Sequence, residues 1–353
     1  MDSQRLPIGA AAIMLFALLS SFVASSSSMA LPPPRAAATN QVFKYWLLPE
    51  AQITSRSPDS SVATAATGIV FDGSSLWMSL TESDSVVKLS TSDGSVEATI
   101  PAGSRPSGLA WDGENIWVAN SGNSSVSKIR AYNGKLLGTF GVGATPVAIL
   151  SDKGDIWVAN SAGDSVTKLR ASDGAVLTTV AVGGGPCGLA SDGINIWVVN
   201  EKSNSITKLN ASDGRVLGTF PVGGSPTAVT FDGVAVWIVN RASGSVTRLR
   251  AADGTPLSTL EVGTMPVGVL FDKTNIWVTN GFQVTKLRDD GSILGTFSAG
   301  GGAGAMAFDG SSLWIANYGS GYVTRLNAQD GKMLGSFGLM VVPKGAVPEA
   351  SQE

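Results

Sequence analysis

Tryptophan recurs along this chain at a fixed interval, and that interval restricts the possible fold more than any other feature. The spacing is 40 residues five times and then 37 residues. The neighbouring letters repeat as well, as in NIWVAN at 115–120 and NIWVVN at 195–200. The recurring residues are Trp77, Trp117, Trp157, Trp197, Trp237, Trp277 and Trp314. A fixed period near 40 residues indicates a repeat architecture whose units pack against their neighbours.

The unit at residues 186–222 shows how one repeat divides. Four short runs are separated by polar turns, among them Asp192-Gly193 and Asp213-Gly214. Asp-Gly pairs favour tight hairpins because both residues tolerate positive φ. Seven such units predict an all-β chain, a seven-bladed β-propeller with four antiparallel strands in each blade. A parallel β-helix has shorter coils, and the 3.6-residue period of a helical solenoid is missing.

The propeller is predicted over residues 66–340, with each blade taking all four strands from its own repeat. Residues 1–30 are predicted to be a signal peptide, because an apolar run at 8–23 precedes Ser28-Met29-Ala30, a small-x-small cleavage site. An uncleaved anchor is the alternative. Residues 31–65 are predicted to be a linker with a possible extra strand at 42–48, and residues 341–353 a tail. We expect a secreted, periplasmic or cell-surface protein with no membrane span after signal removal.

Composition excludes several classes of site. The chain has no histidine, which rules out a Ser-His-Asp triad, a Cys-His dyad and histidine metal ligands. Its one cysteine, Cys187, permits no internal disulfide and is predicted to be a buried or funnel-lining thiol. The net charge of −3 does not indicate a basic surface that would bind nucleic acid. We expect no cofactor and no metal, and a monomer whose partner is an unknown protein or small molecule.

Two rings of polar residues are predicted on opposite faces of the propeller. The Asp-Gly turns gather on one face, where each Asp is expected to bond its own backbone rather than calcium. The other face, which we call the Asn-ring face, carries the Asn that ends the second strand of most blades. These are Asn120, Asn160, Asn200, Asn240, Asn280 and Asn317. The ring can tie strand ends to loops, or it can form a polar mouth that binds a ligand.

Departures from the repeat mark residues that the fold does not require. On the Asn-ring face such departures occur after the ring Asn and before the loop prolines. They give five candidate binding residues, Glu82, Arg105, Glu201, Arg241 and Tyr318. A binding site needs a few converging polar groups in a concave surface. The alternative is solvated surface charge, including a Glu201–Arg241 pair between adjacent blades.

The repeated text resembles the YVTN family of β-propeller repeats. The matching segments are WVAN at 117–120 and 157–160, WVTN at 277–280 and SVTKL at 165–169, together with GTF-x-VG at 138–143 and 218–223. The resemblance covers residues 68–338 and implies a propeller of the exported or surface-layer kind. The chain is also similar at fold level to virginiamycin B lyase-like propellers, which open a cyclic peptide with a histidine base and magnesium. This chain has no histidine to supply that base.

We therefore predict a non-catalytic binding or interaction module that acts through the Asn-ring face, with no catalytic residue. One alternative is a metal-dependent lyase or hydrolase of the virginiamycin B lyase type, using Glu82 or Glu201. A structural cell-surface module is the other alternative. In the seventh unit the stretch Gly300 to Gly304 replaces the usual proline-containing loop, which we interpret as a relaxation of the seam where the ring closes.

Overall fold

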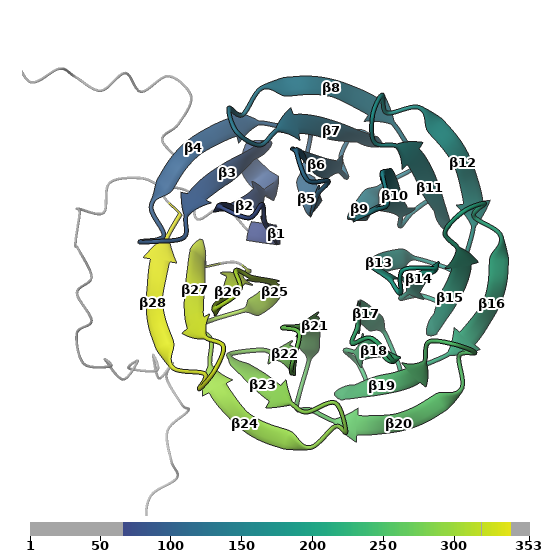
Figure 1. Cartoon of the computed structure of the whole chain (residues 1–353), viewed down its shortest axis with the longest axis vertical. Coiled ribbons are helices and arrows are strands. Elements are labelled where there is room, and N and C mark those ends of the chain that lie inside the picture. Colours follow the sequence, from purple (N-terminus) through teal and green to yellow (C-terminus); the bar gives the residue numbers. More distant parts are fainter. Residues whose placement is uncertain (1–65, 319, 340–353) are drawn as a thin grey trace, which may run out of the picture. The chain divides into compact units, whose positions relative to one another are not determined.

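The computed structural model describes residues 66–318 and 320–339. These residues form seven antiparallel sheets of four strands, arranged in a ring (Figure 1). In every sheet the strand order follows the sequence, from the strand nearest the axis to the strand at the rim. The predicted seven-bladed β-propeller is thereby confirmed. The predicted signal peptide, linker, strand at 42–48 and tail at 341–353 lie outside the described residues.

The strands of blades 1 to 4 are β1 (Ala66–Phe71), β2 (Ser75–Leu80), β3 (Ser85–Ser90), β4 (Val96–Pro101), β5 (Pro106–Trp111), β6 (Asn115–Asn120), β7 (Ser125–Arg130), β8 (Leu136–Gly141), β9 (Pro146–Asp152), β10 (Asp155–Asn160), β11 (Ser165–Arg170), β12 (Val176–Ala181), β13 (Pro186–Ser191), β14 (Asn195–Asn200), β15 (Ser205–Asn210) and β16 (Val216–Pro221). A single-turn 3₁₀ helix, η1 (Thr81–Ser83), joins β2 to β3.

The strands of blades 5 to 7 are β17 (Pro226–Phe231), β18 (Ala235–Asn240), β19 (Ser245–Arg250), β20 (Pro256–Glu261), β21 (Pro266–Phe271), β22 (Ile276–Asn280), β23 (Gln283–Leu287), β24 (Ile293–Ser298), β25 (Ala303–Phe308), β26 (Ser312–Asn317), β27 (Tyr322–Asn327) and β28 (Met333–Gly338). Blade 7 is complete within its own repeat, because β25, β26, β27 and β28 make one sheet. The predicted ring closure is therefore confirmed.

The repeated tryptophans pack between blades, as predicted. All seven are fully buried. Each lies in an apolar cluster with side chains of the next blade, as Trp117 does with Ile156 and Val158 and as Trp314 does with Leu76 and Met78 across the seam. Because both faces of each sheet are covered in this way, the second strand of a blade needs apolar residues on both sides, which explains its continuous hydrophobic text.

In six of the seven blades the Asp of the first hairpin accepts two kinds of hydrogen bond, from its own turn and from the tryptophan. Asp112, for example, accepts the backbone N–H groups of Glu114 and Asn115 with one oxygen and the indole Nε1–H of Trp117, at 2.7 Å, with the other. The same indole bond has a length of 2.6–2.9 Å in the other five blades. The expected bond from Asp to its own turn is thus present, and it also fixes the tryptophan.

Blade 3 departs from this pattern. Its turn reads Asp152-Lys153-Gly154, where Lys153 takes a positive φ of 48°. Asp152 then pairs with Asp155 at the end of the sheet and accepts the hydroxyl of Ser191 at 2.7 Å. The indole N–H of Trp157 is left buried with no hydrogen-bond partner.

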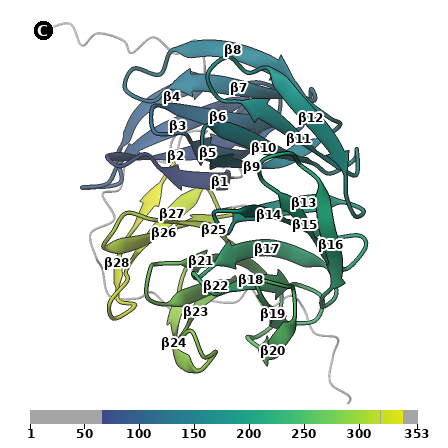
Figure 2. The same cartoon turned by 45° about the vertical axis from the view of Figure 1, so that its right-hand side comes forward.

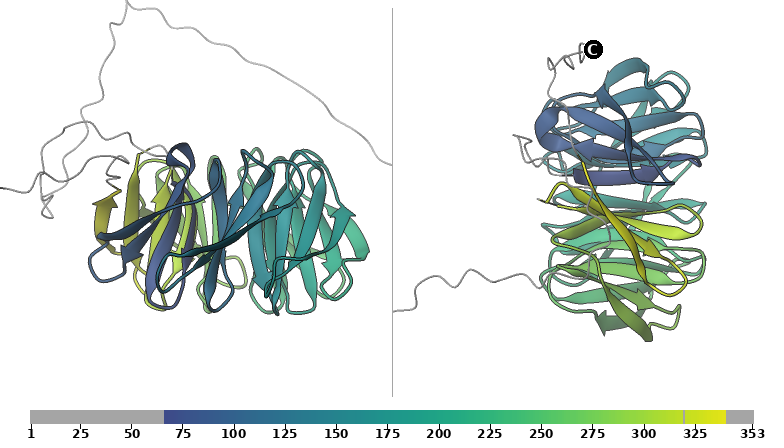
Figure 3. Two further views of the ribbon diagram at one scale, coloured as in Figure 1. Left: turned by 90° about the horizontal axis from the view of Figure 1, so that it is seen from above. Right: turned by 90° about the vertical axis from the view of Figure 1, so that its left-hand side faces the viewer.

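The turns collect on two faces of the propeller, as Figure 3 shows with the ring seen edge-on. In the oblique view of Figure 2 the seven sheets succeed one another around the ring. The turns between second and third strands and the loops between blades lie on the Asn-ring face. The two kinds of Asp hairpin turn lie on the opposite face.

Candidate functional site

The ring asparagines are part of the blade interior. Asn120 is fully buried, and its amide donates to the hydroxyls of Ser125 and Ser127 at 3.1 and 3.0 Å. Its Oδ1 accepts the backbone N–H of Gly103 at 3.0 Å. The amides of the ring residues in blades 3, 4, 5, 6 and 7 also donate to hydroxyls of the neighbouring strand. These bonds tie the second strand to the third in each of the six blades, and at Asn120 they also reach the loop between blades. The Oδ1 atoms of the other five ring residues are buried without a hydrogen-bond partner among the described residues.

A concave site of about 410 Å³ opens on the Asn-ring face where blades 7, 1 and 2 meet. Three of the five candidate residues, Glu82, Arg105 and Tyr318, line it together. They come from three different blades and are brought together only by ring closure. The remaining lining residues are Thr67, Thr81, Asp84 and Ser104. We call this site the seam pocket.

The backbone holds Arg105 in a defined position at the pocket edge. Arg105 takes a positive φ of 52°, and its N–H donates to Oδ1 of Asp84 at 2.8 Å. Its carbonyl accepts both the N–H and the hydroxyl of Ser121, at 3.0 and 2.8 Å. Residues other than glycine seldom adopt this conformation unless neighbours fix it. The main chain is therefore held from two sides while the guanidinium is exposed.

Two threonine hydroxyls form the deeper part of the seam pocket. Oγ1 of Thr67 lies 2.9 Å from Oγ1 of Thr81, which donates to the carbonyl of Pro106 at 2.9 Å. Both threonines are half-buried, whereas Glu82 and Tyr318 are exposed. Among residues 66–318 and 320–339, neither Glu82 nor Arg105 takes part in an ion pair. The pocket thus presents two carboxylates, Glu82 and Asp84, one guanidinium and one aromatic ring beside half-buried hydroxyl groups.

The structure does not bring Glu201 and Arg241 into this pocket. They belong to blades 4 and 5, and within the described residues they form no ion pair with each other. The Glu201–Arg241 pair that belonged to the surface-charge alternative is therefore not formed. Glu201 instead lies close to Cys187: burial, with a smaller contribution from the Glu201 charge, raises the pKa of the thiol to about 12. The Cys187 Sγ–H donates to the carbonyl of Pro226 at 3.4 Å, and the thiol is protonated at neutral pH.

The side chains do not supply a metal centre of the kind that the lyase alternative requires. In the part of the chain that the structure describes, no three His, Cys, Asp or Glu side chains converge on one point. The hairpin aspartates, which could have suggested calcium, already accept hydrogen bonds from their own turns and from tryptophan. A metal-assisted mechanism therefore has no supporting donor set among these residues.

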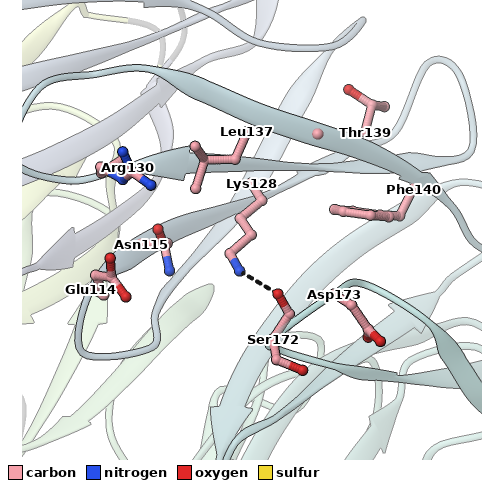
Figure 4. A pocket seen from close by; sticks show the side chains of 10 residues that line it. Glu114, Asn115, Lys128, Arg130, Leu137, Thr139, Phe140, Ser172 and Asp173 are labelled. Carbon is pink, nitrogen blue, oxygen red and sulfur yellow. Dashed lines mark hydrogen bonds between the residues drawn. The ribbon is translucent and has the colours of Figure 1, made fainter.

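The sequence did not point to a second hollow, which lies between blades 2 and 3 (Figure 4). It has a volume of about 500 Å³, and Lys128 extends through it to donate to the carbonyls of Ala171 and Ser172 at 2.7 and 3.2 Å. Arg130 lines the same hollow and forms no ion pair within the described residues. Its counterpart Arg170 pairs with Asp173, but the matching position in blade 2 is Asn133. That substitution is the sequence signal for an unpaired arginine.

Comparisons with known proteins support the fold of this chain. No protein-family model matches the chain, and no curated protein sequence matches it. Among solved structures, the chain is similar to hydrazine synthase from Kuenenia stuttgartiensis, with a TM-score of 0.64 and 18% identity over 77% of this chain and 98% of that chain. It is similar to virginiamycin B lyase from Staphylococcus aureus, with a TM-score of 0.63 and 17% identity over 72% and 92%. A functionally unknown protein from Desulfotomaculum acetoxidans DSM 771 gives a TM-score of 0.67 and 15% identity over 74% and 95%. At these identities the likeness shows the propeller fold and no activity.

Within residues 66–318 and 320–339, no helix is long and apolar enough to cross a bilayer.

Proposed function

We propose that this protein is a binding module, and that it captures a small polar ligand or an exposed polar segment of a partner in the seam pocket without chemical turnover. One observation carries the proposal. Glu82, Arg105 and Tyr318 depart from the repeat, come from three blades, and line one concave surface. Residues that the fold does not need, gathered at one place, are what a binding site requires.

The charges of the pocket favour binding over catalysis. Glu82 lies on the exposed turn η1. The Glu82 side chain is exposed, so no surrounding groups enclose it and hold it against a reacting atom. No set of metal ligands converges in the described residues. Arginine and tyrosine, in contrast, combine contact area with directional donors, which is typical of binding hot spots.

We also propose that the module is exported and belongs with YVTN-type repeat propellers. Support comes from the apolar run at 8–23, the small-x-small site at 28–30 and the repeated WVAN and WVTN segments. A secretion assay tests the export proposal. A fusion that carries residues 1–65 ahead of a reporter should leave the cytoplasm, and the same fusion without residues 1–30 should stay inside.

The binding proposal is tested by a ligand screen on the purified full chain, with thermal shift as the readout. A ligand of the seam pocket should raise the melting temperature of the wild type, and Arg105→Ala or Tyr318→Ala should abolish the rise. Arg215→Ala is the matched control, because Arg215 is an exposed arginine of a hairpin turn on the opposite face. None of these exposed residues is expected to change the melting temperature of the free protein by more than about 2 °C.

A second readout separates binding from turnover. Each ligand found in the screen is incubated with the protein and magnesium and then analysed by mass spectrometry. Recovery of unchanged ligand supports the binding module. Opening of a cyclic ester or lactone that is abolished by Glu82→Gln or Glu201→Gln would replace it with the lyase alternative.

A further inference from the structure

The large apolar side chains that are exposed on the Asn-ring face gather in two neighbouring blades. Within the described part of the chain, these side chains are Met265, Phe282, Tyr318 and Tyr322, and each is at least 50% exposed. Met265 stands in the loop that enters blade 6 and Phe282 in a turn of blade 6. The two tyrosines belong to blade 7, which lies between blade 6 and blade 1 in the ring (Figure 1). We call these four residues the apolar sector.

The same part of the face carries no charge. Its turns and loops are residues 262–265, 281–282, 299–302 and 318–321, and none of these residues is charged. The charged residues of this face come from the turns and loops of the other five blades, and they are Glu82, Asp84, Arg105, Asp164, Glu201, Lys202 and Arg241. In the core of a protein–protein interface charged residues are rare, and Tyr, Phe and Met are common. The apolar sector therefore has the composition of an interface core, and its charged neighbours have that of a polar rim.

Tyr322 takes the place of a residue that stabilises the other blades. In blades 2 to 5 the third strand begins with a buried serine, which accepts the amide of the ring Asn at 3.1–3.2 Å. In blade 7 the third strand begins with Tyr322, and among the described residues the amide of Asn317 donates to Thr324 alone. The tyrosine thus costs the fold a hydrogen bond while it exposes an aromatic ring. Such a departure from what the fold prefers is expected at a functional surface.

The turns that carry Phe282 and Tyr318 are bonded to the same loop. Two N–H groups of this loop, residues 299–303, donate to the carbonyls of Gly281 and Phe282 at 2.8 and 2.9 Å. The carbonyl of its residue Gly302 accepts the N–H of Tyr318 at 2.7 Å. Three main-chain bonds therefore fix both turns before a partner arrives. A surface that is already ordered loses less conformational entropy on binding.

The charges next to the apolar sector follow a fixed order around the ring. Tyr318 lines the seam pocket as well, so the two surfaces are continuous. Blade 1 then contributes Glu82 and Asp84, and the loop into blade 2 contributes Arg105. Within the described residues none of these three side chains is in an ion pair. A segment that crosses this surface therefore meets apolar residues, then two carboxylates, then one guanidinium.

We propose that the apolar sector and the seam pocket together bind an exposed segment of a partner protein. The segment places two or more large apolar residues on blades 6 and 7 and a lysine or arginine beside Glu82 and Asp84. Arg105 bonds an oxygen of the same segment, from a carboxylate or a main-chain carbonyl. This assignment rests on the proposed binding function of the seam pocket and gives the kind of partner.

The test uses a library of random dodecapeptides displayed on phage and panned against the immobilised full chain. Enriched peptides should combine large apolar residues with a lysine or arginine, and fluorescence polarisation measures their affinity in solution. Phe282→Ser should weaken binding about tenfold or more, and Glu82→Lys about fivefold or more. The matched control for Phe282→Ser is Ile194→Ser, because Ile194 is 72% exposed in a hairpin turn of the opposite face.

Tyr322→Ser separates a binding role from a structural role. It restores the serine that accepts the ring amide in blades 2 to 5, so the melting temperature should equal or exceed that of the wild type. Peptide binding should still fall about tenfold or more, because the exposed ring is lost. A lower melting temperature with unchanged affinity would show that Tyr322 serves the fold and would overturn its assignment.

Other outcomes decide between occupants. If no peptide is enriched, if affinities do not respond to Phe282→Ser, or if enriched peptides lack basic residues, the assignment of a partner segment is overturned. Co-sedimentation with phosphatidylcholine vesicles, or a dimer in light scattering, also overturns it if Phe282→Ser abolishes the effect, because a bilayer or a second copy then covers the apolar sector.

The fate of the seam pocket is read from different variants. If peptide binding depends on Arg105 and Tyr318 but not on Phe282 or Tyr322, the seam pocket is a binding site and the assignment to the apolar sector is wrong. If no ligand of any class depends on Arg105 or Tyr318, the proposed function fails as well.

Discussion

A pair of tryptophan-to-phenylalanine variants measures how much the indole–carboxylate bonds contribute to stability. Trp117 donates to Asp112 at 2.7 Å, whereas the indole N–H of Trp157 has no partner. Both rings are fully buried and a lysine ammonium lies over each, at 5.2 and 5.1 Å from the centroid. Two contacts differ: Trp117 packs on the Phe140 ring at 5.6 Å between centroids, an aromatic contact that phenylalanine can keep, and Lys168 above Trp157 pairs with Asp155. Blade 3 therefore supplies a natural control for blade 2.

The expected magnitudes follow from the contacts. Both variants lose buried ring atoms, a packing term of about 1–2 kcal/mol that is common to the pair. Trp117→Phe also breaks a hydrogen bond to a charged acceptor, which contributes about 1.5–3 kcal/mol. Trp157→Phe removes a buried donor that is unsatisfied in the native protein, and this relief offsets part of the packing loss. We expect Trp117→Phe to destabilise by about 2 kcal/mol more than Trp157→Phe.

Thermal unfolding followed by far-ultraviolet circular dichroism measures this difference. For a propeller of this size, about 2 kcal/mol corresponds to about 3–4 °C in melting temperature. Equal melting temperatures for the two variants would refute the argument that the hairpin aspartates stabilise the blades through tryptophan. A third variant, Trp197→Phe, checks generality, because Trp197 donates to Asp192 at 2.9 Å. It should behave like Trp117→Phe.

Further predictions concern acid, thiol chemistry and the two candidates outside the pocket. Burial raises the pKa of Asp112, but hydrogen bonds from Trp117 and the turn outweigh it, and the net pKa is lowered. The ionised carboxylate therefore stabilises the folded protein. Its contribution is complete above about pH 4 and is lost as the pH falls through the folded-state pKa. The melting temperature should therefore drop on acidification below about pH 4 and should not vary through this group between pH 5 and 8. Cys187 is half-buried and has a pKa of about 12, so it should react with iodoacetamide at pH 8 far more slowly than free cysteine, and a comparable rate would contradict the raised pKa. Glu201→Ala and Arg241→Ala should leave ligand binding at the seam pocket unchanged within twofold in titration calorimetry, because neither residue lines it.

The sequence predicts this fold well because the same structural residues recur in each blade. Seven copies of a buried tryptophan, an Asp-Gly turn and an apolar second strand give consistent local and global preferences. The exception in blade 3 also has a sequence signal, because its glycine stands one position later than in the Asp-Gly turns, in Asp152-Lys153-Gly154. The two strands then pair as far as Asp152 and Asp155, and the Asp152 carboxylate does not bond the indole. The lysine alone does not cause this, since Asp272 is followed by Lys273 and still accepts the indole N–H of Trp277 at 2.6 Å.

The candidate site is only partly readable from the sequence. Departures from the repeat identify Glu82, Arg105 and Tyr318, but they identify Glu201 and Arg241 equally well. The position of a residue within its repeat predicts the face of the propeller on which it lies. It does not predict which of the departing residues lie next to one another in the closed ring. Thr67 and Ser104 escaped notice for the opposite reason, since small polar residues at those positions do not stand out from the pattern.

The seam itself leads to a last prediction, because the contacts between blades are unequal. Lys208 of blade 4 is buried, lies over Trp197, and donates to the carbonyls of Ala251 and Ala252 in the next blade, at 2.7 and 2.9 Å. Lys or Arg residues make such bonds at all five boundaries from blade 2 to blade 7. Within the described residues, Lys88 of blade 1 instead pairs with Glu97 of its own sheet at 3.7 Å.

Blade 1 therefore lacks this bond to blade 2, and Arg325 of blade 7 bonds Ser312 of its own sheet at 3.0 Å rather than blade 1. Lys208→Met should cost about 2 kcal/mol or more, since it removes two charged hydrogen bonds and a cation–π contact. Lys88→Met should cost less than about 1 kcal/mol, because its ion pair is partly exposed. Hydrogen exchange followed by mass spectrometry should show blade 1 opening before blades 3 to 5, because neither boundary of blade 1 has the bond from a lysine or arginine side chain to carbonyls of the next blade. Uniform protection around the ring, or equal losses in the two methionine variants, would show that the buried lysines do not hold the blades together.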